Sequence, residues 1–93
     1  MVVGTLGIEL AIVGAQSLKE KRRVLKGLKD RLRQRFNVSV AEVAHQDAWQ
    51  RAGLGVAAVG NDRRFVNAVL SKVIDQVRAA RGVSLVDYEL DLF

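Results

Sequence analysis

The sequence contains no cysteine and no proline, and it has one histidine among its 93 residues. The absence of cysteine excludes disulfides, thiolate catalysis and cysteine-based zinc sites together. No stretch has the composition of a linker, and two separate cores would each be too small to fold alone. Residues 1–93 are therefore expected to form a single domain.

No apolar run approaches the roughly 18 consecutive residues that a membrane-spanning helix needs. The longest apolar region, residues 2–13, is interrupted by Thr5 and Glu9. No Lys or Arg precedes Lys19, so the basic start of a signal peptide is missing. The sequence predicts a soluble cytoplasmic protein with no membrane partner.

Positive charge is concentrated in one segment. Residues 17–36 hold nine basic and two acidic side chains, a net charge of +7, whereas the rest of the chain has six basic and eight acidic ones and carries −2. Charge localised in this way predicts the type of partner rather than the fold. The expected partner of this segment is a polyanion.

Hydrophobic periodicity predicts four strands and two helices. Alternating apolar residues indicate strands at 2–13, 38–44, about 49–59 and 83–92, and the second of these breaks strict alternation in a way that suggests a bulge. Ser17 and Glu20 match a helix capping box, and Asp62 is a second N-cap. The helices are expected to end near Asn37, in a left-handed conformation, and near Ala80, before Gly82.

The order β-α-β-β-α-β with right-handed crossovers is typical of the ferredoxin-like sandwich, a four-stranded antiparallel sheet with two helices on one face. The predicted strand order is fourth, first, third, second, with the central first and third strands parallel to each other. The facing helix stripes predict a group of buried residues, namely Leu25, Leu28, Leu32, Val66, Leu70 and Val73.

Three stretches carry a resemblance to a known family. They are residues 17–23 (SLKEKRR), residues 35–42 (RFNVSVAE) and residues 45–51 (HQDAWQR). Together they resemble the YlxP-like family of small bacterial proteins. The resemblance implies the same ferredoxin-like fold. Genes of that family tend to lie among translation and ribosome-maturation genes, which raises the expectation of a role connected with RNA.

Six cations of the first predicted helix share one flank, between about 40° and 160° from the core direction when each residue turns by about 100°. They are Lys19, Arg22, Arg23, Lys26, Lys29 and Arg33. A row of cations on a helix can follow phosphates, because counterion release drives such binding. The alternative is a solvated face with local pairs such as Lys26–Asp30. If the flank binds phosphates, its cations should be solvent-facing and unpaired.

Lys21 lies on the apolar stripe of the same helix, between Leu18 and Leu25. One interpretation is that its ammonium group extends past the end of the sheet into water. The other places it near the connection between the second and third strands, where it would meet a ligand anion.

Residues 45–51 combine polar, titratable and aromatic groups: His45, Gln46, Asp47, Trp49 and Arg51. His45 and Asp47 could form a base and its orienting group, or two ligands of a metal, but no third ligand is identifiable. Structural use of a turn anchored by Trp49 is one alternative. Contact with a nucleotide through Trp49 and Arg51 is another.

The sheet face away from the helices offers Thr5, Gly7, Gly55 and Ala57 on its central strands. It has no central aromatic residues for base stacking, so RNA recognition through this face is disfavoured. Interior glycines favour the close approach of a ligand or another backbone, so a homodimer contact or a small-ligand site remains open.

No catalytic constellation is complete. Acylphosphatases use this fold, but they need an arginine in the loop after the first strand, and residues 14–16 have none. Neither GxGxxG nor a P-loop is present. The sequence thus favours a non-catalytic module without cofactor or metal, associated with RNA or the ribosome through the basic helix and residues 45–51. The alternative is a homo-oligomeric ligand-binding or protein-interaction domain that uses the glycine-rich sheet face.

Overall fold

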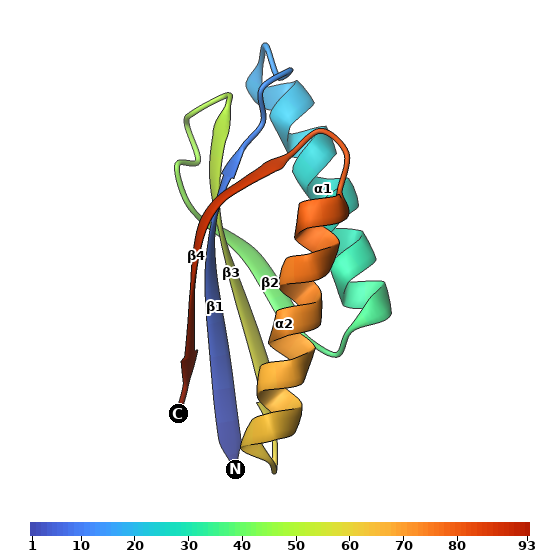
Figure 1. The fold of residues 1–93 in the computed structure, drawn as a ribbon. Helices are drawn as coiled ribbons and strands as arrows, with labels where there is room; N and C mark the ends of the chain where they lie inside the picture. The colour runs from blue at the N-terminus through green and yellow to red at the C-terminus, as the bar shows by residue number, and fades with distance from the viewer.

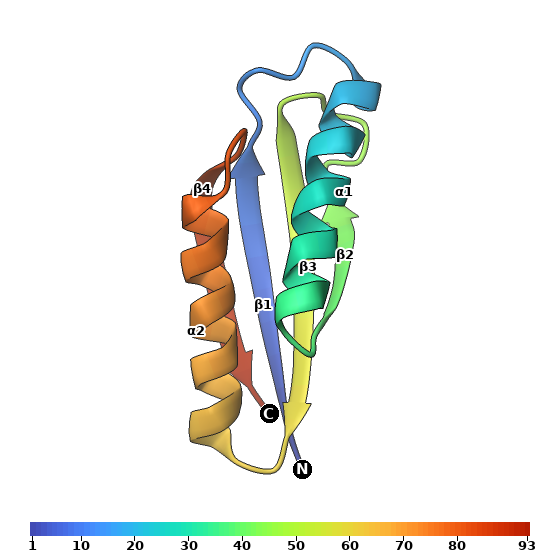
Figure 2. The ribbon, with the colours of Figure 1, turned by 90° about the vertical axis from the view of Figure 1, so that its right-hand side faces the viewer.

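A computed structural model describes residues 1–93 as one four-stranded sheet with two helices packed on one face (Figure 1). Along the chain the elements are β1 (Val2–Ala11), α1 (Leu18–Arg35), β2 (Ser39–Ala44), β3 (Arg51–Gly60), α2 (Arg63–Ala79) and β4 (Ser84–Leu92). The helices lie antiparallel and side by side, as Figure 2 shows. The predicted ferredoxin-like fold is confirmed.

The strand order β2-β3-β1-β4 is the predicted one, but every neighbouring pair is antiparallel. The expected parallel pairing of β1 with β3 is therefore wrong. A crossover through α1 brings β2 back in the direction of β1, and the connection from β2 to β3 then reverses the chain. Since β3 lies between β2 and β1, it must run against both.

The core fills the space between the sheet and the helices. All six residues that the helix stripes predicted to be buried are at most 2% exposed. These helix residues pack in one cluster with Leu6, Ile8 and Leu10, which alternate along β1 on the side of the sheet that faces the helices. A Cβ atom at Gly4 would lie 2.6 Å from Val66 Cγ1, so glycine is what allows α2 to approach β1 this closely.

The helix ends follow the predicted signals in part. Ser17 caps α1 by accepting a hydrogen bond from the Glu20 amide at 3.1 Å. The Glu20 carboxylate accepts from the Gln16 amide at 2.7 Å, one residue earlier than a capping box predicts. The C-terminal end of α1 is capped by Phe36 in an extended conformation, so the left-handed stop expected at Asn37 is wrong.

Two bulges set which side chains face the helices. The predicted irregularity of the second strand is confirmed, because the β2–β3 register shifts around Val43. A second shift, around Val86, was not predicted. It pairs Leu85 with Leu10 and packs Leu85 against the core, which leaves Val86 exposed although strict alternation along residues 83–92 would place Val86 on the same face as Leu90. Neither helix combines the length and apolar composition needed to cross a membrane.

Candidate nucleic-acid interface on the helical side

Lys21 is buried at the N-terminal end of α1, with its side chain 1% exposed. Its ammonium group lies 2.9 Å from Glu42 Oε2 of β2 and donates a hydrogen bond to the His45 carbonyl oxygen at 2.6 Å. No other hydrogen-bond donor reaches that Glu42 oxygen. The interpretation that the ammonium group extends into water is therefore wrong. Its expected position near the connection between β2 and β3 is confirmed, but the groups that it meets there are Glu42 and the His45 carbonyl oxygen. It joins α1 to β2.

His45 and Arg51 meet at Glu9 of β1. Glu9 lies 3.0 Å from His45 Nε2 through one oxygen and 3.1 Å from an Arg51 nitrogen through the other. The hydrogen bond from His45, with help from Arg51, lowers the pKa of Glu9 below its usual value. The pairing of His45 with Asp47 that the sequence allowed does not form, because His45 adopts a left-handed backbone (φ 60°) and bonds across the sheet to β1.

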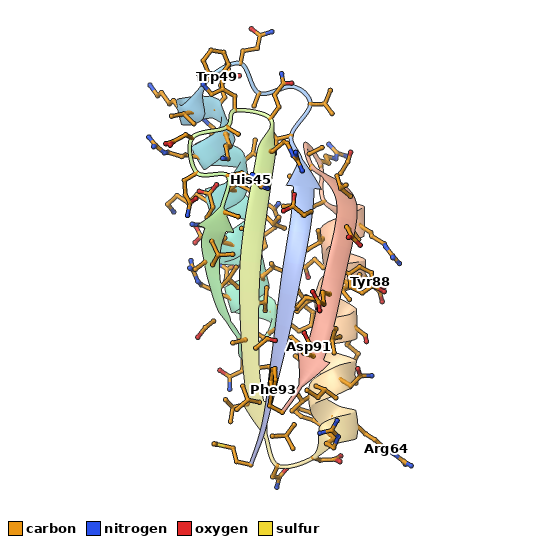
Figure 3. The ribbon with its side chains drawn as sticks, turned by 90° about the vertical axis from the view of Figure 1, so that its left-hand side faces the viewer. His45, Trp49, Arg64, Tyr88, Asp91 and Phe93 are labelled. Atoms are coloured by element: carbon orange, nitrogen blue, oxygen red, sulfur yellow. The ribbon has the colours of Figure 1, made fainter.

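The other residues of the segment 45–51 differ in whether they form hydrogen bonds within the protein. The Ala48 amide closes a turn on the His45 carbonyl oxygen, and the Gln50 side chain donates to the Ala15 carbonyl oxygen at 3.0 Å. Gln46 and Asp47 are exposed and make no side-chain hydrogen bond. Trp49 is 53% exposed at the tip of the molecule, so it does not anchor the turn by burial (Figure 3).

The predicted cationic flank is only partly free. Lys26 bonds Asp30 at 2.8 Å, and Arg33 lies 3.6 Å from the same carboxylate. Arg33 also donates to the Val40 carbonyl oxygen of β2 at 2.6 Å. Lys26 above all, and then Arg33 and Lys29, lower the pKa of Asp30. The expectation that Lys26 and Arg33 are unpaired is therefore wrong. We call Lys21, Lys26, Asp30 and Arg33 the β2 side of α1.

The remaining cations of α1 have no ion pair and no side-chain hydrogen bond within the protein. Four of them come from the predicted set, and two others, Arg31 and Arg35, were not in it. All are exposed except Lys29, which is half-buried. The six free cations of α1 are Lys19, Arg22, Arg23, Lys29, Arg31 and Arg35.

Acidic groups lie on the opposite side of the molecule. Asp87, Glu89 and Asp91 alternate along the outer face of edge strand β4, where the register places them beside Glu9, Gly7 and Thr5 (Figure 3). A shallow trough of about 540 Å³ runs beside Glu89 and Asp91, over Gly7, Gly55 and other residues of the outer sheet face. An anion is thus favoured at the helices and disfavoured at this edge of the sheet.

Glu42 and Glu9 were not singled out from the sequence. Glu42 had a signal, because it alternates with the apolar Val40 and Ala44 on β2 and so shares the inward face with a charged partner, Lys21, on the apolar stripe of α1. Glu9 had no such signal, because its contacts come from residues far along the chain. No cluster of three or more histidine, aspartate or glutamate side chains could hold a metal ion.

Comparison with known proteins places the chain in a family. Residues 3–90 match the family DUF503, described as a protein of unknown function. The chain belongs to the DUF503 family. A relative of the chain, the uncharacterized protein YlxP of Bacillus subtilis (strain 168), is 42% identical over 73 residues, which cover 78% of this chain and 79% of that protein. The resemblance found in the sequence is confirmed.

Solved structures with the same fold have unrelated sequences. A de novo designed protein with ferredoxin fold, LFR1 1, superposes with a TM-score of 0.57 at 8% identity, covering 100% of this chain and 84% of the design. SnoaB, a cofactor-independent oxygenase from Streptomyces nogalater, gives a TM-score of 0.53 at 15% identity, covering 99% of this chain and 90% of SnoaB. At these identities the similarities show the fold of the DUF503 chain alone, so its function must be argued from its own residues.

Proposed function

We propose that this protein is a non-catalytic RNA-binding module, associated with RNA alone or within the ribosome, that uses the helical side of the fold. The observation that carries the proposal is the set of six free cations on α1, none of which forms an ion pair or a side-chain hydrogen bond within the protein. Cations that the fold does not use remain available to phosphates, and counterion release then drives binding. The cytoplasmic location expected from the sequence belongs to the same proposal.

Residues 45–51 have a narrower part in this proposal than the sequence suggested. His45, Gln50 and Arg51 are occupied by contacts within the protein. Trp49 is exposed at the end of the molecule where α1 begins, so its ring is free to stack on an unpaired base (Figure 3).

The test is the affinity of the purified protein for total or ribosomal RNA as a function of salt concentration. Three to five phosphate contacts with single-stranded RNA predict a log–log slope of roughly −2 to −3.5. Trp49→Ala should lower the affinity without changing the slope, because a ring contributes stacking and no charge. If the wild-type protein shows no salt-dependent affinity at low ionic strength, the proposal is wrong.

A second candidate function uses the trough on the outer sheet face, either as the contact of a homodimer or as a site for a small ligand. The supporting observation is its lining of small side chains with Glu89 and Asp91 on one wall, which would suit a cationic group. Sedimentation velocity distinguishes the two candidates. A stable dimer that lacks RNA affinity would favour the trough, and a monomer that binds RNA favours the helical side.

A further inference from the structure

Three hollows follow one another between the outer surfaces of α1 and α2. The first, of about 480 Å³, is lined by Arg23 and Arg31 from α1 and by Arg81 after α2. The second, of about 460 Å³, shares Arg31 and adds Arg35. The third, of about 250 Å³, shares Arg35 and ends at Phe65. Because neighbouring hollows share an arginine, they form one groove along the helix pair, which we call the interhelical groove.

The interhelical groove is basic throughout. No acidic residue lines any of its three parts. None of its four arginines forms an ion pair or donates a side-chain hydrogen bond within the protein. Its lining includes Gly27, Ala79 and Ala80, which are too small to fill the space. An unneutralised set of guanidinium groups in an open groove is suited to phosphate.

The spacing of the arginines indicates a chain of phosphates instead of a single anion. Arg23, Arg31 and Arg35 are separated by multiples of four residues, so they lie along one ridge of the helix. From first to last they span about 18 Å along the helix axis. One isolated phosphate could engage only part of such a row, whereas a phosphodiester backbone could follow all of it.

An aromatic ring stands at the end of this row. Phe65 is 60% exposed and lies outside the apolar stripe of α2. In the third hollow it shares the lining with Arg35, whose guanidinium lies 5.8 Å from the ring centre of Phe36. Cations that follow a backbone, combined with an exposed ring, are the features by which proteins hold unpaired nucleotides.

We propose that the interhelical groove binds one single strand of nucleic acid, with its phosphates along Arg23, Arg31 and Arg35 and a base stacked on Phe65. The inference rests on the proposed RNA-binding function and specifies where the strand lies and that it is unpaired. A duplex would keep the faces of its bases inside the stack, out of reach of Phe65. Recognition is expected to tolerate many sequences, since stacking and phosphate contacts do not read base edges.

The first part of the test compares a short labelled uridine RNA with an RNA duplex of equal length by fluorescence anisotropy. The single strand should bind more tightly to the wild-type protein. Phe65→Leu should weaken that binding roughly 5- to 100-fold at an unchanged salt slope, and Phe65→Trp should retain it. Equal affinity for the duplex together with no effect of Phe65→Leu would overturn the proposal.

The second part removes charge from one side of α1 at a time. Replacing Arg23, Arg31 and Arg35 together by glutamine should reduce the magnitude of the salt slope by about 2. The matched control replaces Lys19, Arg22 and Lys29 by glutamine, which removes the same charge elsewhere on the helix and should change the slope much less. Glutamine preserves helix propensity, so both variants should fold, which a thermal melt checks.

The outcomes separate this inference from the proposed function. If only the control set reduces the slope, RNA binding stands and the groove is the wrong site. If the wild-type protein binds neither RNA, both proposals fail together.

Discussion

The two sides of α1 carry cations in different chemical situations. On the β2 side, Lys21 bonds Glu42, while Lys26 and Arg33 meet Asp30. On the side toward α2, Arg31 and its neighbours in the interhelical groove have no acid within reach. The net charge of the helix is thus a poor guide to a binding surface, because part of it holds the fold together. Cations without a partner in the protein are the better guide.

The largest expected effect comes from Lys21, on the β2 side. Lys21→Met should lower the free energy of unfolding by about 3–5 kcal/mol, since it leaves the Glu42 carboxylate, 18% exposed, without its counter-charge. Urea denaturation measures this. The double variant Lys21→Met, Glu42→Leu should recover most of the loss, because no unpaired charge remains. A single variant as stable as the wild-type protein would show that the buried pair contributes nothing.

A second prediction concerns a variant that introduces an acidic residue into the interhelical groove, which has none. Gln34 is exposed and lines the groove with Arg31 and Arg35. Gln34→Glu should neutralise one or both arginines and so reduce the magnitude of the RNA salt slope by about 0.7 to 1.4. Gln34→Lys, which changes charge in the opposite sense, should steepen it. Equal slopes for the two variants would argue against the groove.

A third prediction concerns Glu9 and the pH dependence of folding. The folded protein lowers the pKa of Glu9, so its ionised form favours the folded state. That contribution is complete above the unfolded pKa and disappears as the pH falls through the folded one. Glu9→Gln should therefore melt at a lower temperature than the wild-type protein at neutral pH. The difference should shrink in acid, and a difference that stays constant down to acid pH would contradict this assignment.

The smallest effect is expected for Asp30→Asn, which frees Lys26 and Arg33 on the β2 side. Because these cations lie away from the interhelical groove, the RNA salt slope should stay close to that of the wild-type protein. A slope steeper by about 1.4 would mean that RNA crosses the β2 side, as the sequence analysis first suggested.

The sequence predicted what depends on local patterns. The fold, the core stripes and the caps at Ser17 and Asp62 follow from periodicity and from short-range hydrogen bonds. The prediction that Lys26 is unpaired is wrong, although its partner Asp30 lies only one helical turn away. The prediction compared the total number of bases in residues 17–36, nine, with the total number of acids, two, and did not ask which individual pairs form. Charge counts do not say which pairs form.

The groove could not be predicted from the helix alone. Helical angles separate the two sides of α1, but they do not say which side faces α2. Arg81 and Phe65 join the groove only because the antiparallel arrangement of the helices brings the end and the start of α2 beside Arg23 and Arg35, respectively (Figure 2). Residues so distant in sequence share no pattern that would connect them.

The most direct test of the division between the two sides is an NMR titration that follows the arginine Nε–H signals as single-stranded RNA is added. The signals of Arg23, Arg31 and Arg35 should shift or broaden, while the signal of Arg33, held by the Val40 carbonyl oxygen, should stay in place. If the signals of Arg33 and Arg22 move while those of Arg23, Arg31 and Arg35 stay unchanged, RNA binds the β2 side and the division between the two sides is wrong.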